Sequence, residues 1–369
     1  MFRSFALFIL AFVACAAILE AKETIKIGVI LPLSGQQSQN GEDLQDALLM
    51  KQKELKGQTT KFDYQLFFED DAMTPRMAAE AAQKLINIDH VDMILSFSGS
   101  GIAVSPIAES KKIIHIGMSF SPAVARGFYC FDNFPKPAPI ATLMIEFCKA
   151  AGYQNVAILG QHQAGTDATE DAFKAMTPAA KINIVTLQKF ARPERDFRVA
   201  LLKIREKNPD VVLVDAFDPE AMIILQQMHD IAFQIPITSM GNWGTFHDEA
   251  FYNRPYVEAL PNRSFIQNFQ RLYKRQSAYY SGIIYDSFGM LTHVCEECDG
   301  SRHPSNTVIA GKLRNIRNYP GVMGDLSPDS YGWFNIPAVL VIQIPEGRRQ
   351  ITLAEAVHLA RVQNPASSH

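Results

Sequence analysis

Residues Ile25–Gly35 read IKIGVILPLSG, and this stretch decides the fold. Its first part, IKIGVIL, is almost entirely apolar, as in a strand that is buried inside a sheet. Pro32 and the pair Ser34-Gly35 then end the strand, because proline lacks a backbone N–H and glycine favours turns. The next segment, Gly41–Leu55, places leucine and alanine residues at helical spacing. A buried strand followed by an amphipathic helix is the first half of a βαβ unit.

The same alternation of strands and helices continues along the chain. Further strands are predicted at Tyr64–Glu69, Val91–Phe97, Ile113–Ile116, Asn155–Leu159, Ile182–Gln188, Val211–Val214 and Ile237–Met240. Helices are predicted between them at Pro75–Ile88, Ile102–Lys111, Pro139–Ala151, Phe197–Lys207 and Glu220–Ile231, with one more that ends near Phe173. This order predicts parallel sheets with right-handed crossovers. Because the series restarts near Pro139, we expect two doubly wound lobes, with no low-complexity linker between them.

The C-terminal third is less regular. Helices are predicted at Phe265–Arg275, Ser281–Cys298 and Thr307–Ile316, and a strand is predicted at Val339–Ile344. The last helix, Thr352–Val362, is amphipathic, and Thr352 is a suitable N-cap residue for it.

Residues 1–21 have the composition of a secretory signal peptide. Arg3 supplies a positive charge, Phe5–Leu19 is almost wholly apolar, and Ala21 is a small residue before the polar chain begins. The apolar run is shorter than the roughly 20 residues of a membrane-spanning helix. Two other interpretations stay open: a permanent membrane anchor, and lipid attachment at Cys15, because Val13-Ala14-Cys15 partly resembles a bacterial lipobox. We expect an exported chain that is cleaved after Ala21.

Composition is typical of a soluble globular protein. The 369 residues are enough for two domains, and the chain is 47% hydrophobic and 20% charged. The formal net charge is -3, and no block of lysine and arginine residues occurs. This charge gives no reason to expect a nucleic acid or an anionic membrane as a partner.

Four cysteines remain after the predicted signal peptide: Cys130, Cys148, Cys295 and Cys298. In an oxidising compartment an even number of cysteines can pair. The segment Cys295-Glu-Glu-Cys298 has the spacing of a redox pair or of half a zinc site. No second CxxC and no histidine cluster accompany it, so we favour buried structural cysteines and expect no metal ion and no cofactor.

Small polar residues follow several predicted strands. They are Ser34-Gly35, Ser98-Gly99-Ser100 and Ser119-Phe120-Ser121. In open α/β sheets ligands bind at the carboxyl ends of the strands. Serine hydroxyls and the N–H groups of a following helix suit a carboxylate or another polar group. Such residues also cap helices and form turns; the presence of three such loops in one lobe is what indicates a binding face.

Catalytic motifs do not occur in the sequence. There is no Gly-x-Ser-x-Gly, no P-loop and no GxGxxG. The histidines are scattered, and only His162 and Asp167 share a loop in which they could do acid–base work. We therefore expect a binding protein rather than an enzyme.

Several stretches follow one another in the order of a known family. They are Ile25–Gly35, Phe68–Ala72 with Pro75, Ser98–Glu109, Ser119–Pro122, Val156–Ala168, Pro209–Ala221 and Tyr285–Ser287. Each is short, but together they extend over nearly the whole mature chain. The chain resembles the branched-chain amino-acid and amide-binding proteins of ABC importers, a leucine/isoleucine/valine-binding protein-like family with the type I periplasmic-binding-protein fold.

This resemblance implies two Rossmann-like α/β lobes, a three-strand hinge and an interlobe cleft that closes on a ligand. It implies an N-terminal lobe at 22–140 plus about 270–319, a C-terminal lobe at 141–269 plus about 320–350, and a C-terminal helix and tail at 351–369. It further implies a monomer in the periplasm that delivers a small-molecule ligand to an ABC permease and ATPase complex. A sensory or regulatory protein of the same fold, acting on a receptor in trans, is the alternative.

The resemblance also implies a set of ligand-binding residues. The set is Ser98, Gly99, Ser100, Ser119, Phe120, Ser121, Asn40, Ala164, Phe217, Asp218 and Trp243. In the family, the two serine-rich loops hold the ligand's carboxylate and contact its amine. This chain has Ala164 where relatives have tyrosine, and Trp243 aligns with the acidic residue that binds the amine.

An ammonium group in a desolvated cleft needs a counter-charge. Either Asp218 supplies that charge, or the loops align a residue or two away, or the ligand has no amine. We favour the last of these, and expect a small carboxylate or amide with an apolar body rather than a standard branched-chain amino acid.

Overall fold

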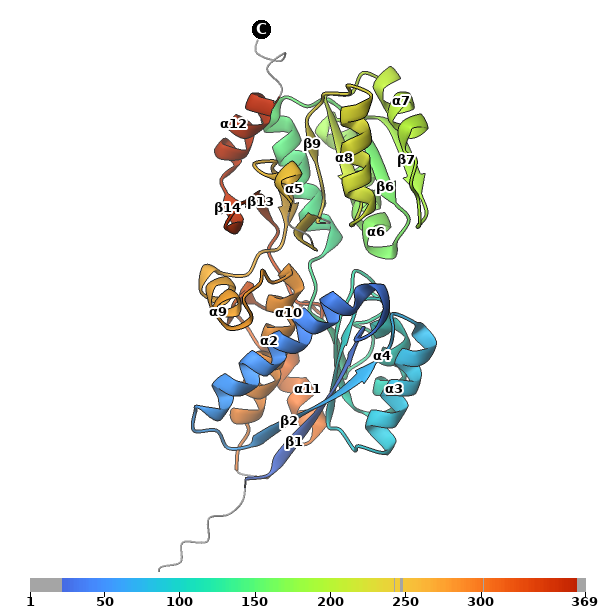
Figure 1. Cartoon of the computed structure of the whole chain (residues 1–369). Helices are drawn as coiled ribbons and strands as arrows, with labels where there is room; N and C mark the ends of the chain where they lie inside the picture. Colours follow the sequence, from blue (N-terminus) through green and yellow to red (C-terminus); the bar gives the residue numbers. More distant parts are fainter. Residues whose placement is uncertain (1–21, 242, 246–247, 301, 364–369) are drawn as a thin grey trace, which may run out of the picture.

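The computed structural model describes residues 22–241, 243–245, 248–300 and 302–363. The predicted signal peptide with Cys15, and the end of the C-terminal tail, lie outside the described residues. The described chain forms two lobes, one above the other in Figure 1, and each is built around its own parallel sheet. Within these residues, no helix has both the length and the apolar character that a membrane span requires.

The N-terminal lobe contains a five-stranded parallel sheet in the order β2-β1-β3-β4-β5. Its strands are β1 (Thr24–Leu31), β2 (Asp63–Asp70), β3 (Met93–Phe97), β4 (Ile114–Met118) and β5 (Cys130–Asp132). The elements that connect them are the 3-10 turn η1 (Gly35–Gln37) and the helices α2 (Ser38–Lys56), α3 (Pro75–Asn87) and α4 (Ser100–Lys111). The sequence predicts every one of these strands except β5, which is too short to show a pattern.

A later part of the chain returns to complete this lobe. It consists of α9 (Arg263–Tyr273), α10 (Tyr279–Glu296), α11 (Asn306–Asn315) and the hairpin β11 (Tyr319–Gly321) and β12 (Gly324–Leu326). The predicted range of this returning segment, about 270–319, is wrong at both ends. Phe265 and Phe269 of α9, and residues as late as Ile336, are buried in the N-terminal core, so the segment extends from about Ala259 to Ile336.

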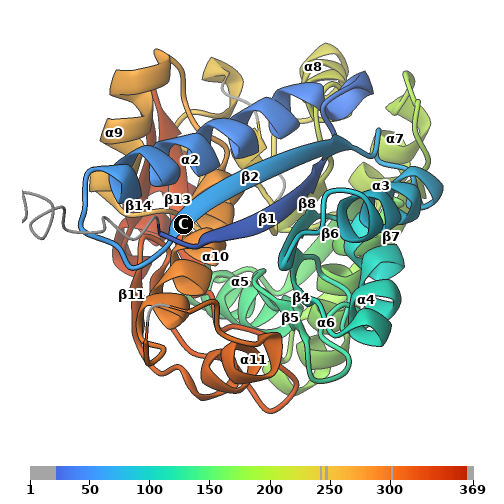
Figure 2. The ribbon, with the colours of Figure 1, turned by 90° about the horizontal axis from the view of Figure 1, so that it is seen from below.

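Strand β1 shows why the opening stretch of sequence forms a buried strand. Alternate residues, from Ile25 to Leu31, pack on one face against α2, α9 and α10. Ile30 points to the other face, which α3 and α4 cover; Figure 2 shows α2 and the α3–α4 pair on different sides of the sheet. Gly28 allows α3 to pack closely on this face, because a Cβ there would lie 2.8 Å from a methyl carbon of Leu85 and would force that side chain to shift.

The C-terminal lobe repeats this plan with a four-stranded parallel sheet in the order β7-β6-β8-β9. Its strands are β6 (Asn155–Gln161), β7 (Asn183–Phe190), β8 (Val211–Asp215) and β9 (Ile237–Thr238). Its helices are α5 (Pro137–Ala151), α6 (Ala164–Ala180), α7 (Arg198–Glu206) and α8 (Glu220–Asp230). Residues of α5 and α6 belong to the core on one face of the sheet, and residues of α7 and α8 belong to the core on the other.

Further elements complete the C-terminal lobe. They are the 3-10 turns η2 (Trp243–Thr245) and η3 (Glu249–Phe251), the antiparallel strands β10 (Tyr256–Glu258), β13 (Val339–Ile344) and β14 (Gly347–Ile351), and the helix α12 (Leu353–Gln363). Thr352 caps α12 as predicted, since its hydroxyl accepts a hydrogen bond from Glu355 N at 3.2 Å. Ala356 and Ala360 of α12 pack in the same core as α5, so this helix belongs to the C-terminal lobe.

The chain crosses between the lobes three times. The crossings lie between Phe134 and α5, between β10 and α9, and between Ile336 and β13. The predicted α/β fold with two parallel-sheet lobes is confirmed. The carboxyl ends of β3, β4, β6 and β8 all contribute residues to the pocket between the lobes.

Candidate functional site

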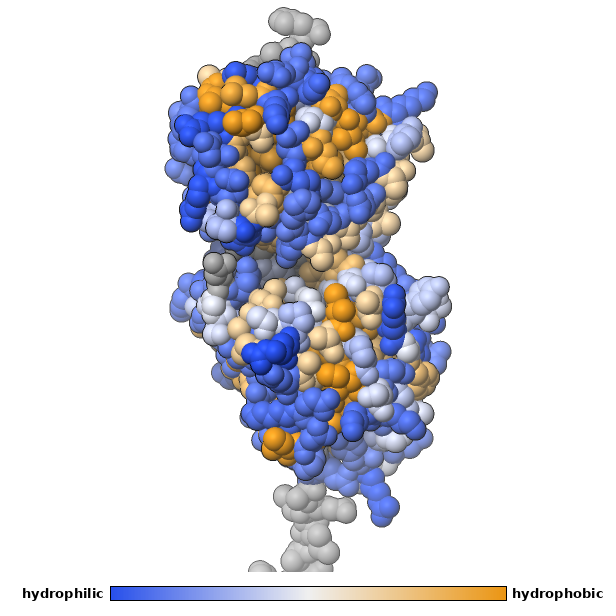
Figure 3. Space-filling view, turned by 90° about the vertical axis from the view of Figure 1, so that its right-hand side faces the viewer, coloured by the Kyte–Doolittle hydropathy of each residue, from blue (hydrophilic) through white to orange (hydrophobic). Residues whose placement is uncertain are grey.

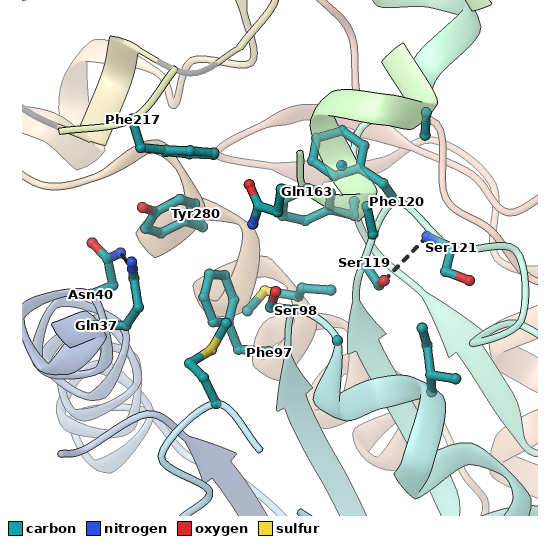
Figure 4. Close-up of a pocket in the computed structure, with 18 of the residues that line it drawn as sticks. Gln37, Asn40, Phe97, Ser98, Ser119, Phe120, Ser121, Gln163, Phe217 and Tyr280 are labelled. Atoms are coloured by element: carbon teal, nitrogen blue, oxygen red, sulfur yellow. Dashed lines mark hydrogen bonds between the residues drawn. The ribbon is translucent and has the colours of Figure 1, made fainter. Parts of the chain in front are cut away.

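A pocket of about 450 Å³ lies between the two lobes. This volume is within the range of roughly 300–1,000 Å³ that is usual for small-molecule sites. Figure 3 shows the molecule hollowed between the lobes. Figure 4 shows side chains from both lobes converging on the pocket. Its lining residues are Gln37, Asn40, Met73, Pro75, Phe97, Ser98, Gly99, Ile102, Met118, Ser119, Phe120, Ser121, Pro122, Phe134, Gln161, Gln163, Ala164, Gly165, Ala168, Arg192, Phe217 and Tyr280.

Ser98 stands at the end of β3, where the chain turns into α4. Its φ of 59° is in the left-handed region, which is uncommon for a residue other than glycine and is often found at functional sites. The backbone N–H of Ser98 donates to Met118 O at 2.8 Å, so the ends of β3 and β4 are held together. Among the described residues, the Ser98 hydroxyl has no protein partner, and it is therefore available to a ligand.

Ser119 and Ser121 form the corresponding turn after β4. Ser121 N donates to Ser119 Oγ at 3.1 Å, and Ala123 N donates to Ser121 Oγ at 3.3 Å. Each hydroxyl accepts a hydrogen bond in this turn and keeps its own proton for a ligand in the pocket. Both serines line the pocket, because parallel strands end at the same edge of the sheet.

Asp132 is hydrogen-bonded to the Ser119 loop. Its Oδ1 accepts a hydrogen bond from Ser119 N at 3.1 Å, and the side chain is fully buried. Burial raises the pKa of Asp132 well above its usual range. The buried carboxyl holds the Ser119 loop in place through this hydrogen bond.

Three of the predicted site residues lie elsewhere. Ser100 is buried and its hydroxyl donates to Asp71 Oδ2, so it anchors the start of α4 instead of facing the pocket. Asp218 is exposed and outside the lining. Trp243 is fully buried, with Nε1 donating to Val214 O at 3.1 Å and its ring packed on Phe251 at 4.9 Å between centroids. The prediction that Trp243 walls the ligand is wrong, because its indole fills the C-terminal core.

Phe120 lines the pocket and contacts both lobes. It extends from the N-terminal lobe and packs against the cores of both lobes. Its ring meets Phe134 edge-on at 4.6 Å between centroids. The Phe120 ring also lies directly against Gly165 in the first turn of α6, where a Cβ atom would overlap the ring.

Gln163 is a lining residue that sequence reasoning did not select. It precedes α6, and its side chain points into the pocket in Figure 4. Its Oε1 is buried and has no hydrogen-bond partner among the described residues. A buried amide oxygen without a partner is costly, so this side chain is suited to bind a polar group of a ligand. Its position could have identified it, because Gln163 lies in the loop that follows β6, the first strand of the C-terminal lobe.

Arg192 is the only charged residue in the lining that the structure describes. Its Nε lies 3.0 Å from Oε2 of the buried Glu220, and its Nη2 donates to Asp218 O at 3.0 Å. These two contacts hold the guanidinium in one orientation and leave Nη1 without a protein partner among the described residues. The sequence analysis did not select this residue, because it lies two positions after the end of β7 and belongs to no motif or family stretch.

The remaining candidates for chemistry do not meet in the pocket. His162 and Asp167 are 3.7 Å apart, with side chains 59% and 42% exposed, and neither lines the pocket. Within the described residues, no group of three or more histidine, cysteine or acidic side chains is placed to hold a metal ion. The arrangement is therefore suited to binding a small molecule.

Comparison with known proteins identifies the family of this chain. The sequence profile of a family described as periplasmic binding protein matches residues 24–331. A curated relative, the Leu/Ile/Val-binding protein BraC3 of Rhizobium johnstonii, is 25% identical over 223 residues, which are 58% of this chain and 60% of the relative. The aligned part is thus less than two thirds of that relative's length.

Solved structures share the fold over most of the chain. The leucine binding protein LivK of Thermotoga maritima has a TM-score of 0.76 at 20% identity, with 89% of this chain and 98% of that chain covered. A solute binding protein of an ABC transporter from Rhodopseudomonas palustris, in complex with 3,4-dihydroxy benzoic acid, has a TM-score of 0.77 at 18% identity, with 89% and 96% covered. At 20% and 18% identity, this structural similarity shows the fold of the chain and does not identify its ligand.

Proposed function

Because the chain belongs to the periplasmic binding protein family, we propose that it is the extracytoplasmic solute-binding component of an ABC importer. Its ligand is a small carboxylate with an apolar or aromatic body and no α-amine. The ligand is captured between the lobes and delivered to a membrane permease. The charge of the pocket lining is the observation that carries this proposal.

The described lining contains no aspartate, no glutamate and one arginine. A bound amino acid would bring an ammonium group into this pocket with no carboxylate to pair with it. An unpaired charge in a desolvated site costs several kcal/mol, of the order of 3. A ligand carboxylate, by contrast, meets the hydroxyls of Ser98, Ser119 and Ser121 and the N–H groups at the start of α4.

The rest of the lining is apolar and largely aromatic. Phe97, Phe120, Phe134, Phe217 and Tyr280 contribute rings, and Met73, Met118 and Ile102 contribute flexible or branched side chains. Such walls favour a planar or bulky apolar body over a sugar or a polyamine. Gln163 and Arg192 are then left to bind a polar group at the end of the ligand that lies away from the serines.

Proteins of similar structure bind carboxylates that have an α-amine and carboxylates that lack one. The Rhodopseudomonas palustris structure holds 3,4-dihydroxy benzoic acid, while a LivJ protein of Streptococcus pneumoniae was solved with isoleucine. The same fold therefore accommodates a carboxylate with or without an α-amine. The absence of an acidic lining residue from the described pocket favours a carboxylate without an α-amine for this chain.

Matched pairs of ligands test this proposal. Thermal-shift and calorimetric measurements compare 3-phenylpropionate with L-phenylalanine, and 4-methylpentanoate with L-leucine, since each pair differs only in the α-amine. We expect the carboxylate without the amine to bind roughly 100-fold more tightly and to raise the melting temperature by about 5 °C at saturation. Tighter binding of leucine or phenylalanine than of its partner would overturn the proposal.

The serine loops provide a second test, with the best-bound carboxylate as ligand. Replacing Ser98 by alanine is expected to weaken binding about 10-fold, because one hydrogen bond to a charged group is lost. Ser110→Ala is the matched control, since the Ser110 hydroxyl is exposed near the far end of α4 and donates to Ile107 O at 2.8 Å. Equal affinities of the two variants, measured by titration calorimetry, would exclude a role for Ser98 in binding.

A further inference from the structure

We propose that Cys295 and Cys298 are joined by a disulfide in the mature protein, formed by thiol–disulfide exchange with an oxidised dithiol protein of the extracytoplasmic compartment. This pair takes no part in the binding of the ligand. Both residues are thiols in the structure, and both are buried.

The backbone already has the spacing that a disulfide needs. Cys295 lies in the last turn of α10, and Cys298 follows the end of that helix. Cys298 N donates to Cys295 O at 3.1 Å, which closes a turn between residues three apart. Such a turn keeps the two Cα atoms within about 7 Å, and disulfides join Cα atoms about 4.4–6.8 Å apart.

The two thiols belong to the same turn of the chain. Burial raises the pKa of Cys295 well above its usual range, and the neighbouring Cys298 raises it further. The Cys298 thiol now donates to Val294 O at 3.2 Å. Formation of the disulfide would replace this hydrogen bond, and requires the Cys298 side chain to rotate about its Cα–Cβ bond.

The other two described cysteines have no partner within reach. Cys130 belongs to β5 in the N-terminal lobe, where its thiol donates to Ser105 O at 3.3 Å. Cys148 lies on α5 and is buried in the core of the C-terminal lobe. They serve as internal references that should stay reduced when Cys295 and Cys298 do not.

The chemistry is a balanced two-step exchange. The Cys298 thiolate attacks one sulfur of the oxidant's disulfide and releases the first oxidant thiolate. The Cys295 thiolate then attacks the Cys298 sulfur in the mixed disulfide and releases the second oxidant thiolate. In total, two protein thiols are oxidised and one oxidant disulfide is reduced. Cys298 is the better first nucleophile, because Lys312 and Lys61 oppose the rise in its pKa that burial causes.

The disulfide would join the last turn of α10 to Cys298, just beyond the end of that helix and next to the start of β2. Lys61 Nζ donates to Cys298 O at 2.8 Å, and the intervening Glu296 accepts from Lys61 N at 2.7 Å and from the Tyr64 hydroxyl at 2.6 Å. The pocket residue Tyr280 lies near the opposite end of the same helix. The disulfide should therefore change the stability of the protein and leave ligand affinity unchanged.

Alkylation of the exported full chain tests the proposal. The protein is purified from an oxidising compartment without reductant, unfolded in the presence of iodoacetamide and mapped by peptide mass spectrometry. We expect Cys130 and Cys148 to be alkylated, and the peptide that carries Cys295 and Cys298 to be unalkylated and about 2 Da lighter than its dithiol form. Alkylation of all four residues, or any cross-link to Cys130, Cys148 or a second chain, would overturn the proposal.

Stability provides an independent measurement. Reduction of the wild-type protein is expected to lower the melting temperature by roughly 2–5 °C, because a closed loop in the unfolded chain is released. Cys298→Ser should show the lower melting temperature with or without reductant, and Cys148→Ser should keep the dependence on reductant. Should Cys298→Ser not fold, the alkylation of the wild-type chain decides the question alone.

Discussion

Replacing Gly165 by valine is expected to weaken ligand binding by about 100-fold and to leave the melting temperature of the ligand-free protein nearly unchanged. Gly165 lies in the first turn of α6, and any Cβ atom there would overlap the ring of Phe120 from the other lobe. Phe120 is also in edge-on contact with Phe134, at 4.6 Å between ring centroids, and this contact restricts the movement of its ring. Valine at this position should therefore hold the lobes apart, and a 100-fold loss corresponds to about 2.7 kcal/mol against the closed state.

The matched control for this variant is Gly311→Val. Gly311 lies on α11 in the N-terminal lobe, and a Cβ atom there meets nothing within 4 Å. Calorimetry measures the affinity for the best-bound carboxylate, and small-angle scattering measures whether the ligand makes the protein more compact. If Gly165→Val binds and compacts as well as Gly311→Val does, Phe120 yields in solution and the contact does not control closure.

Replacing Arg348 by methionine is expected to lower the free energy of unfolding by about 3–5 kcal/mol at pH 8. Arg348 on β14 lies 2.9 Å from the carboxylate of Glu258 on β10, and both side chains are almost fully buried. The guanidinium also donates to Ser277 O in the other lobe, close to the second crossing. The methionine variant would leave the Glu258 carboxylate buried without its counter-charge.

The loss of unfolding free energy in the Arg348→Met variant should grow as the pH rises. Burial raises the pKa of Glu258 to about 7 even with Arg348 present, and removal of the cation raises that pKa further. The folded variant then binds this proton more tightly than the unfolded chain, whose glutamate has a pKa near 4.5. Its stability should consequently fall as the pH rises from about 5 to about 8, and the deficit at pH 5 should be the smaller one.

Arg349→Met is the control, because the neighbouring ion pair is exposed. Arg349 lies 2.6 Å from Glu355, but the two side chains are 48% and 36% exposed. Exposed pairs contribute little, so this variant should differ from the wild type by less than about 1 kcal/mol. Urea unfolding of both variants at the two pH values measures the differences. Equal losses, or a loss at Arg348 that does not change with pH, would contradict the argument.

Much of the candidate site could be predicted from local sequence. Ser98, Ser119 and Ser121 follow apolar strands, and parallel strands bring their carboxyl ends to one edge of the sheet. Gly99, Phe120, Asn40, Ala164 and Phe217 also line the pocket as predicted from the family resemblance. Their direct contact with a ligand remains a prediction.

The errors arise where a side chain's direction depends on its tertiary surroundings. Ser100 belongs to the same serine-rich loop as Ser98, yet Asp71 turns its hydroxyl away from the pocket. Trp243 follows a strand end like the true lining residues, but the C-terminal core takes up its indole ring. Spacing along the chain does not distinguish these outcomes, because adjacent residues of a loop can point in opposite directions.

The sequence by itself determined the two series of strands and helices and the positions of the serine loops, since apolar periodicity and turn residues act over a few neighbouring positions. Only the tertiary structure decided which lobe receives α9, because an amphipathic helix offers its apolar face to any core that it reaches. It also decided that Gln163, Arg192 and Tyr280 meet in one pocket, and that no described acidic residue joins them there. These residues come from three distant parts of the chain, and long-range packing alone brings them together.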